Sequence, residues 1–221
     1  MSFLADVPLL RGSLVRLEPL SASHGADLAV AAEEDRGAYG FTVVPRAREV
    51  EDYLRAHAER TAAGKLVPFA QIRQADGRAV GVTSYHDPRF WPAAAGSPAG
   101  LCAVDIGWTW LAGSAQRTGI NGEAKLLLMD YAFEALGVVR VGFGTDARNE
   151  RSRQAIAGLG ARFEGVLRHW SPSRAPGEDG CLRDSALFSV IAAERPATRA
   201  ALCQRQTTQA GRAQAGRGRV G

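Results

Sequence analysis

Cysteine is scarce in this chain of 221 residues and occurs only as Cys102, Cys181 and Cys203. The number is odd and no pair has CxxC spacing, which excludes a small scaffold held together by disulfides. We therefore expect reduced thiols, as in a cytoplasmic protein. No group of histidine, cysteine and aspartate has the spacing of metal ligands, so no metal is expected.

Long apolar runs are also missing. No stretch approaches the roughly 20 residues that a membrane helix requires. The N-terminal sequence MSFLADVPLLRG lacks the basic start and long apolar segment of a secretory signal. These absences predict a cytoplasmic protein without membrane contact. The hydrophobic content of 46% is that of a globular chain and excludes a fully disordered one.

Charge of one sign is concentrated only at the C-terminal end. The whole chain has 27 Lys and Arg against 23 Asp and Glu, but residues 194–221 contain six arginines and one acid. Because this segment has few large apolar residues, we expect a disordered basic tail after a single domain of residues 1–193. A nucleic-acid-binding arm is the alternative for the tail, whereas the nearly neutral body argues against a dedicated nucleic-acid binder.

Hydrophobic periodicity predicts one domain of mixed α/β class without an internal boundary. Residues 88–100 contain three prolines and two glycines and are expected to form a long irregular connection. The expected strands are 13–20, 67–73, 79–86, 101–111, 138–145, 162–170 and 182–191, and the expected helices are 21–34, 50–64, 119–136 and 149–159.

The segment between the expected strand 101–111 and the expected helix 119–136 carries the most specific signal. A glycine-bearing loop at this point places unpaired backbone N–H groups at the positive end of a helix dipole, which favours a bound phosphate. The GxxxxGK[ST] pattern of nucleotide P-loops and the GxGxxG pattern of dinucleotide sites are both absent. The loop therefore predicts a phosphate-bearing ligand outside those two classes.

This loop resembles the pyrophosphate loop of the GNAT (GCN5-related) N-acetyltransferases, whose pattern is Gln/Arg-x-x-Gly-x-Gly/Ala, with Asn121 where Gly or Ala is usual. Residues 108–111 resemble the splayed fourth strand of that family, and residues 149–152 and 159–165 resemble its second cofactor element. The resemblance spans about residues 11–192 and is nearest to the branch of ribosomal-protein-alanine N-acetyltransferases.

The resemblance implies a GNAT fold, in which helices flank a central, mostly antiparallel mixed sheet. It implies direct transfer of the acetyl group of acetyl-CoA to a primary amine, either a protein or peptide N-terminus or a small molecule, and it suggests a homodimer. Main-chain groups of Trp110 and Leu111 would pair with the pantetheine arm. The loop residues that would hold the pyrophosphate are Gln116, Arg117, Thr118, Gly119, Ile120, Asn121 and Gly122.

Four residues are candidates for the chemistry. Asn149 would contact pantetheine or an ordered water, with a helix cap as the alternative. Ser152, one turn later, would protonate the leaving thiolate, with an exposed helix serine as the alternative. Asp105 and His86 compete as the base that takes the proton of the attacking amine. An ion-paired aspartate and a surface histidine are their respective alternatives.

Aromatic residues in the expected loops would flank the acceptor amine. The candidate substrate contacts are Tyr39, Phe41, His86, Trp91 and Trp108. For Trp91 and its neighbour Phe90 the alternative is packing of the long connection against the core. A non-catalytic acyl-CoA-binding or regulatory module on the same fold is the alternative function, because fold alone does not determine activity.

Overall fold

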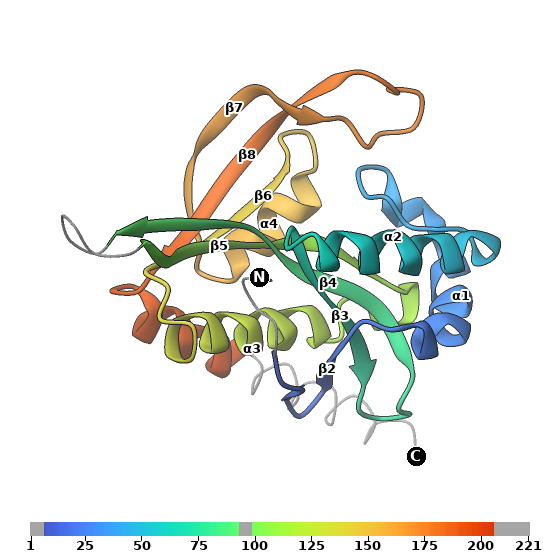
Figure 1. The fold of residues 1–221 in the computed structure, drawn as a ribbon, viewed down its shortest axis with the longest axis horizontal. Helices are drawn as coiled ribbons and strands as arrows, with labels where there is room; N and C mark the ends of the chain where they lie inside the picture. Colours follow the sequence, from blue (N-terminus) through green and yellow to red (C-terminus); the bar gives the residue numbers. More distant parts are fainter. Residues whose placement is uncertain (1–6, 93–98, 206–221) are drawn as a thin grey trace, which may run out of the picture.

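The computed structural model describes residues 7–92 and 99–205, which form one mixed sheet of eight strands in the order β1-β2-β3-β4-β5-β6-β8-β7 (Figure 1). Every neighbouring pair of strands is antiparallel except β5 and β6, which run parallel. The predicted mostly antiparallel mixed sheet is confirmed. The strands are β1 (Leu10–Arg11), β2 (Val15–Pro19), β3 (Leu66–Arg73), β4 (Ala79–Pro92), β5 (Ala99–Leu111), β6 (Arg140–Asp146), β7 (Arg162–Pro172) and β8 (Leu182–Ile191).

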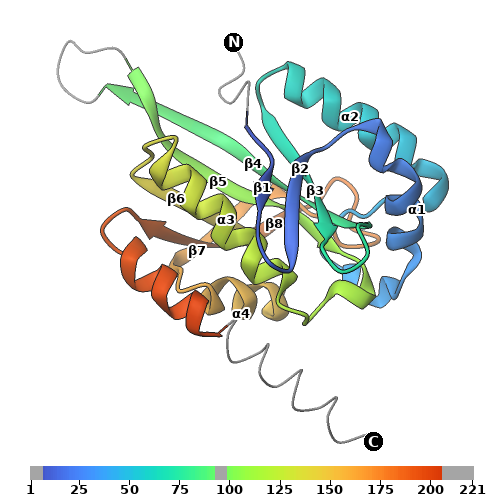
Figure 2. The same ribbon diagram turned by 90° about the horizontal axis from the view of Figure 1, so that it is seen from below.

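Helices lie on both sides of the sheet, with α1 and α2 together on one side and α3 on the other (Figures 1 and 2). On one side, the Nε1–H of Trp110 on β5 donates to the hydroxyl of Tyr53 on α2 at 3.1 Å. On the other, the hydroxyl of Tyr85 on β4 donates to the carbonyl of Leu128 on α3 at 2.5 Å. The main helices are α1 (Gly25–Glu33), α2 (Val50–Ala62), α3 (Ile120–Glu134) and α4 (Glu150–Gly158).

Strands β5 and β6 separate soon after they meet. They pair over three residues only, Ala103–Asp105 against Arg140–Gly142. Farther along, β5 contains a bulge in which Trp108 and Thr109 stand opposite the single residue Thr83 of β4, and Trp108 has a φ of +51°. A bulge bends its strand and increases the local twist. A gap therefore opens between β5 and β6 beyond their short paired stretch.

The expected irregular connection at 88–100 is wrong for the residues of it that the structure describes. Strand β4 continues to Pro92 and β5 begins at Ala99, so the two form a long antiparallel ribbon with Arg89 opposite Ala103 and Trp91 opposite Gly100. Cross-strand pairing overrides the local preference of proline for turns, and a register shift after His86 accommodates it. Residues 93–98 lie outside the described part.

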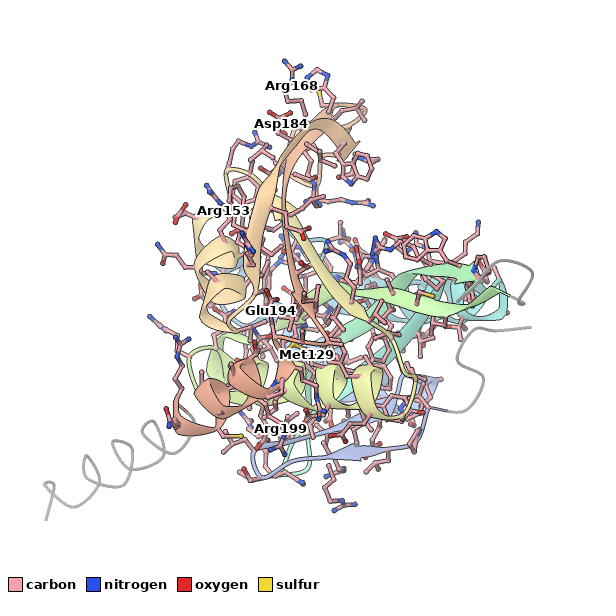
Figure 3. All side chains as sticks on the ribbon, turned by 90° about the vertical axis from the view of Figure 1, so that its left-hand side faces the viewer. Met129, Arg153, Arg168, Asp184, Glu194 and Arg199 are labelled. Atoms are coloured by element: carbon pink, nitrogen blue, oxygen red, sulfur yellow. The ribbon has the colours of Figure 1, made fainter. Side chains whose placement is uncertain are left out.

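The expected disordered tail is wrong for residues 195–205. Residues 195–205 are helical, and Leu202 is buried. Arg195 and Arg199 both donate to the carboxylate of Asp130 on α3, at 3.0 and 3.1 Å. Figure 3 shows this helix beside α3, with Arg199 close to Met129. Ion pairs and one apolar anchor thus attach residues that composition alone assigned to the tail, and residues 206–221 lie outside the described residues.

Among the described residues, no helix is both long and apolar enough to cross a bilayer.

Candidate active site

A cleft of about 1210 Å³ begins at the gap between β5 and β6. We divide its lining residues into two groups, called the helix-start arm and the tryptophan arm, according to the elements that supply them. The helix-start arm is lined by the loop before α3 and by the first turns of α3 and α4, including Gln116, Arg117, Gly119, Asn121, Gly122, Asn149, Arg151 and Ser152. The tryptophan arm is lined by α2, β4, β5 and the β7–β8 hairpin, including Arg60, His86, Trp108, Trp170, Arg174 and Arg183.

In the helix-start arm, the backbone turns sharply before α3. Gly119, with a φ of +93°, is the residue that precedes the helix, and Arg117 has a φ of +61°. The hydroxyl of Thr118 donates to the carbonyl of Ala115 at 2.6 Å and fixes the turn. The first N–H groups of a helix have no intrahelical acceptor and lie at the positive end of its dipole. The arrangement therefore favours an anion at the start of α3.

Polar side chains around this turn also suit an anionic ligand. Asn121 lines the arm with a side-chain amide whose NH₂ group can donate to an anion, while its buried Oδ1 is an acceptor without a hydrogen-bond partner among the described residues. Arg151 donates to the Oε1 of Gln116 at 3.1 Å and to the carbonyl of Ala38 at 3.1 Å, which holds its guanidinium at the arm. Together with Arg117, which also lines the arm, it supplies the positive charge that phosphate groups require.

Along β5, the backbone N–H and C=O groups of successive residues point alternately toward the gap and toward β4. The N–H of Ala112 donates to the carbonyl of Val80 on β4 at 2.8 Å, so by alternation Trp110 also faces β4 while Leu111 faces the gap. This alternation favours Leu111 over Trp110 for the expected main-chain contact with a pantetheine arm, and both residues line the cleft. The carbonyl of Leu111 already accepts from Gln116 at 2.9 Å and from the Tyr39 hydroxyl at 3.0 Å, which leaves its N–H.

Asn149 and Ser152 are brought together at the start of α4. The Oδ1 of Asn149 accepts the N–H of Ser152 at 3.0 Å, so Asn149 caps the helix, as the alternative for this residue proposed. Both residues still line the helix-start arm. Capping uses the amide oxygen of Asn149 and leaves its NH₂ group to face a ligand.

His86 and Asp87 form an oriented pair in the tryptophan arm. The Nδ1 of His86 is hydrogen-bonded to the Oδ2 of Asp87 at 2.9 Å, and this bond lowers the pKa of the Asp87 carboxyl. The Nε2 lies over Gly107 of β5, where a Cβ would come within 2.5 Å of it. Glycine at 107 therefore makes room for the imidazole, whose Nε2 is free to accept a proton.

Asp105 is ion-paired, as the alternative for this residue proposed. It lies opposite His86 across β4 and β5 and forms an ion pair with the Nη2 of Arg89. Arg89 belongs to the part of β4 that the sequence assigned to a loop, so its approach could not be anticipated. Oxygen or nitrogen atoms of His86, Asp87 and Asp105 lie within 4.8 Å of one another, as metal ligands would, but Arg89 already neutralises the Asp105 carboxylate.

Trp108 lies at the centre of the tryptophan arm. The guanidinium carbons of Arg60 and Arg174 lie 4.7 and 5.5 Å from the centre of its ring, and the His57 ring meets it edge-on at 6.2 Å. Within the described residues, neither arginine has a carboxylate within ion-pair distance. Two unpaired guanidinium groups on one indole ring create a site that favours a negative charge.

The remaining aromatic candidates lie in different places. Phe41 lines the cleft beneath the guanidinium of Arg148, at 5.3 Å. Tyr39 also lines the cleft, and its hydroxyl donates to the carbonyl of Leu111 near the helix-start arm. The expected substrate contact by Trp91 stays a prediction, because this residue of the β4–β5 ribbon is half exposed and is not among the described residues that line the cleft.

Sequence reasoning missed Lys125. This lysine of α3 is buried, lines the cleft and donates to the hydroxyls of Thr83 and Thr109, at 2.7 and 2.5 Å. Its signal was available: it is a charge between the buried residues Ala124 and Leu126. The other buried charge of α3, Glu123, has a structural explanation, since it accepts hydrogen bonds from the backbone of residues 13–15.

Comparison with known proteins yields one family and a set of similar folds. Residues 15–162 match the family described as acetyltransferase (GNAT) domain. No curated protein matches the chain. A solved GCN5-related N-acetyltransferase from Brucella melitensis is 28% identical, with a TM-score of 0.77 over 90% of this chain and 85% of that one.

Two more distant structures share the fold and were solved with coenzyme A bound. RimJ from Mycobacterium smegmatis, in complex with CoA-disulfide, is 22% identical, with a TM-score of 0.69 over 90% of this chain and 93% of that one. RimL, described as a ribosomal L7/L12 alpha-N-protein acetyltransferase in complex with coenzyme A, is 16% identical, with a TM-score of 0.64 over 83% and 98%. The expected fold is confirmed.

Proposed function

The chain belongs to the GNAT acetyltransferase family, and we propose that it transfers the acetyl group of acetyl-CoA directly to a primary amine. The observation that carries this proposal is the gap between β5 and β6, which leads from the bulge of β5 to the turn before α3. An extended pantetheine arm would lie along the gap with the N–H of Leu111 beside it, and its pyrophosphate would meet the amides of Gly119–Gly122.

The acceptor amine would enter through the tryptophan arm. An amine is protonated at neutral pH and must lose a proton to attack the thioester carbonyl. We assign this step to His86, because Asp87 fixes its Nδ1 and leaves Nε2 facing the cleft. Asp105 is less suited, since its charge is already paired with Arg89. A main-chain N–H of β5 on the open side of the bulge would stabilise the oxyanion.

We favour a peptide N-terminus as the acceptor, with a small-molecule amine as the alternative. Support comes from the resemblance to ribosomal-protein acetyltransferases and from the similar fold of RimL, which is described as an alpha-N-protein acetyltransferase. The open tryptophan arm, with Trp108 and Trp170 along its walls, would suit the first residues of a peptide. As in the sequence-based prediction, we place the protein in the cytoplasm.

Release of free thiol from acetyl-CoA tests the proposal. The purified protein is mixed with acetyl-CoA and a panel of amines: short peptides with free N-termini, the same peptides with blocked N-termini, and small amines. Thiol release that requires a free amine, with the acetylated product found by mass spectrometry, is the expected result. If acetyl-CoA binds but no amine promotes thiol release, the protein is instead a non-catalytic acyl-CoA-binding module.

A further inference from the structure

The amine of Lys125 occupies an unusual position for a lysine. Lysine is almost never fully buried without an acidic partner, yet the hydrogen bonds of this one go to the hydroxyls of Thr83 on β4 and Thr109 on β5. The two hydroxyls are 2.9 Å apart, so the three groups form a compact cluster beneath the bulge. Burial lowers the pKa of Lys125 to about 7, so both protonation states are accessible near neutral pH.

The titratable groups on the neighbouring elements have other partners. Glu123 of α3 is bound to the backbone of residues 13–15, and Tyr85 of β4 donates to the carbonyl of Leu128. On β5, Asp105 is paired with Arg89, and at the end of β6, Asp146 is paired with Arg148. None of these groups compensates the charge of Lys125, whose lowered pKa is attributable to burial alone.

We propose that Lys125 supplies the proton that the CoA thiolate takes up as it leaves, with the Thr109 hydroxyl as the bridge. This inference rests on the proposed acetyl transfer. Thr109 precedes Trp110 in the bulge of β5 and lines the cleft. A pantetheine arm that starts at the turn before α3 and passes Leu111 would therefore bring its sulfur end to Thr109.

The transfer balances without any further reactant. The acceptor nitrogen forms a bond to the carbonyl carbon, the carbon–sulfur bond breaks, and the electron pair remains on sulfur. The Thr109 hydroxyl, which donates to the carbonyl of Gly107 at 3.2 Å, turns to the sulfur, gives it its proton and receives one from the Lys125 ammonium group. The acceptor nitrogen loses one proton before attack and a second as the amide forms. Both pass through His86 to solvent and solvent reprotonates Lys125, so one proton is released overall.

Lys125 suits this role better than Ser152, the donor expected from the sequence. A proton donor works best when its pKa lies near the operating pH. A thiol has a pKa of about 8.5, so an ammonium group with a pKa near 7 can protonate a thiolate, whereas a serine hydroxyl needs a second source of protons. Ser152 also belongs to α4, away from the Thr83–Thr109 pair.

Two measurements on Lys125→Met test the proposal. In steady-state kinetics, we expect kcat to fall about 100-fold while the KM for acetyl-CoA stays within about twofold. The kcat of the wild type should fall above neutral pH as Lys125 loses its proton, and this fall should be absent from the pH profile of Lys125→Met. Thr109→Val should reduce kcat in the same direction. Arg78→Met, which removes an exposed cation of the β3–β4 hairpin that is not among the described lining residues, is the control and should leave kcat unchanged.

The second measurement does not depend on turnover. The ultraviolet absorbance of the thiolate gives the pKa of CoA bound to each protein, and we expect this pKa to be about one unit higher with Lys125→Met than with the wild type. Equal thiol pKa values, or a Lys125→Met enzyme with wild-type kcat and pH profile, would overturn the proposal. Absence of thiol release from the wild type would instead refute the acetyl transfer itself.

Discussion

The two arms of the cleft are built in different ways. The helix-start arm comes largely from two short continuous segments, residues 116–122 and 149–152, whose local conformation creates the site. The tryptophan arm is assembled from α2, β4, β5 and the β7–β8 hairpin, and its key contacts join residues far apart in the chain, such as Arg60 and Arg174 at Trp108. The first arm binds through backbone geometry, whereas the second depends on side chains.

We expect the largest effect from a substitution that disrupts the helix-start arm. Gly119→Glu places a side chain at a φ of +93° and a negative charge where the pyrophosphate would bind. We expect the affinity for acetyl-CoA, measured by calorimetry, to fall at least about 100-fold, because steric strain and repulsion act together. Gly77→Glu is the matched control: its φ is +73°, it lies in the β3–β4 hairpin, and it should leave the affinity unchanged. Wild-type affinity in Gly119→Glu would refute the assignment of this arm.

A change in the tryptophan arm should separate catalysis from cofactor binding. His86→Ala removes the proposed base, so we expect turnover with a saturating amine to fall about 100-fold or more. The dissociation constant of acetyl-CoA should stay within about twofold, since His86 lies in the other arm. Asp87→Asn, which keeps the imidazole but weakens its orientation, should have a smaller effect. A His86→Ala enzyme with normal turnover would transfer the role of base to Asp105 or to water.

Lys125, which lines the cleft, should lower the free energy of unfolding, because its amine is buried for a role in the reaction. Its pKa is about 7 in the folded protein and about 10.4 in an unfolded chain, so the unfolded state binds more protons between these values. The unfolding free energy therefore rises with pH across this window, and the cost of burying the lysine is fully present below about pH 7. We expect Lys125→Met to stabilise the protein at pH 7 by about 2–4 kcal/mol.

Thermal unfolding of Lys125→Met and the wild type at pH 7 and pH 10 measures this cost. The stability difference between the two proteins should shrink as the pH rises toward 10. A Lys125→Met protein that is less stable than the wild type at pH 7 would show that the lysine supports the fold through its hydrogen bonds to Thr83 and Thr109.

The smallest expected effect concerns the charge of the acceptor. Arg60 and Arg174 have no carboxylate partner among the described residues. An acidic side chain next to the acceptor amine could therefore form an ion pair with them. For the double variant Arg60→Ala/Arg174→Ala, we expect the KM of a peptide with glutamate at its second position to rise about tenfold. The KM of the matched glutamine peptide should barely change. Equal changes in KM for both peptides would mean that the arginines shape the arm without recognising the charge of the peptide.

The contrast between the arms also explains what the sequence could reveal. Gly119 and the cap residue Asn149 act through local backbone conformation, so their spacing predicted the helix-start arm. The pairing of Asp105 with Arg89 required the extension of β4 through a proline-containing segment, which local turn preferences conceal. The stacking of two arginines on Trp108 depends on how α2 and the β7–β8 hairpin fold toward each other, and no spacing along the chain encodes it.

The fold followed the same rule. The order of strands and helices was predictable from periodicity, because most main elements bury their own apolar residues. Strand β7 is an exception, since its Phe163 and Trp170 are exposed. The helix at 195–205 was missed because its stability comes from contacts with another element: Arg195 and Arg199 bind Asp130 of α3, and Leu202 is buried. Composition measures what a segment can bury by itself and not what a neighbouring helix offers it.

Calorimetric titration of the wild-type protein with acetyl-CoA, with ATP and NADH as controls, tests the central claim most directly. We expect selective binding of one acetyl-CoA per chain with a micromolar dissociation constant. Absence of acetyl-CoA binding, or equal binding of ATP and NADH, would contradict the claim that the gap between β5 and β6 and the turn before α3 form an acyl-CoA site.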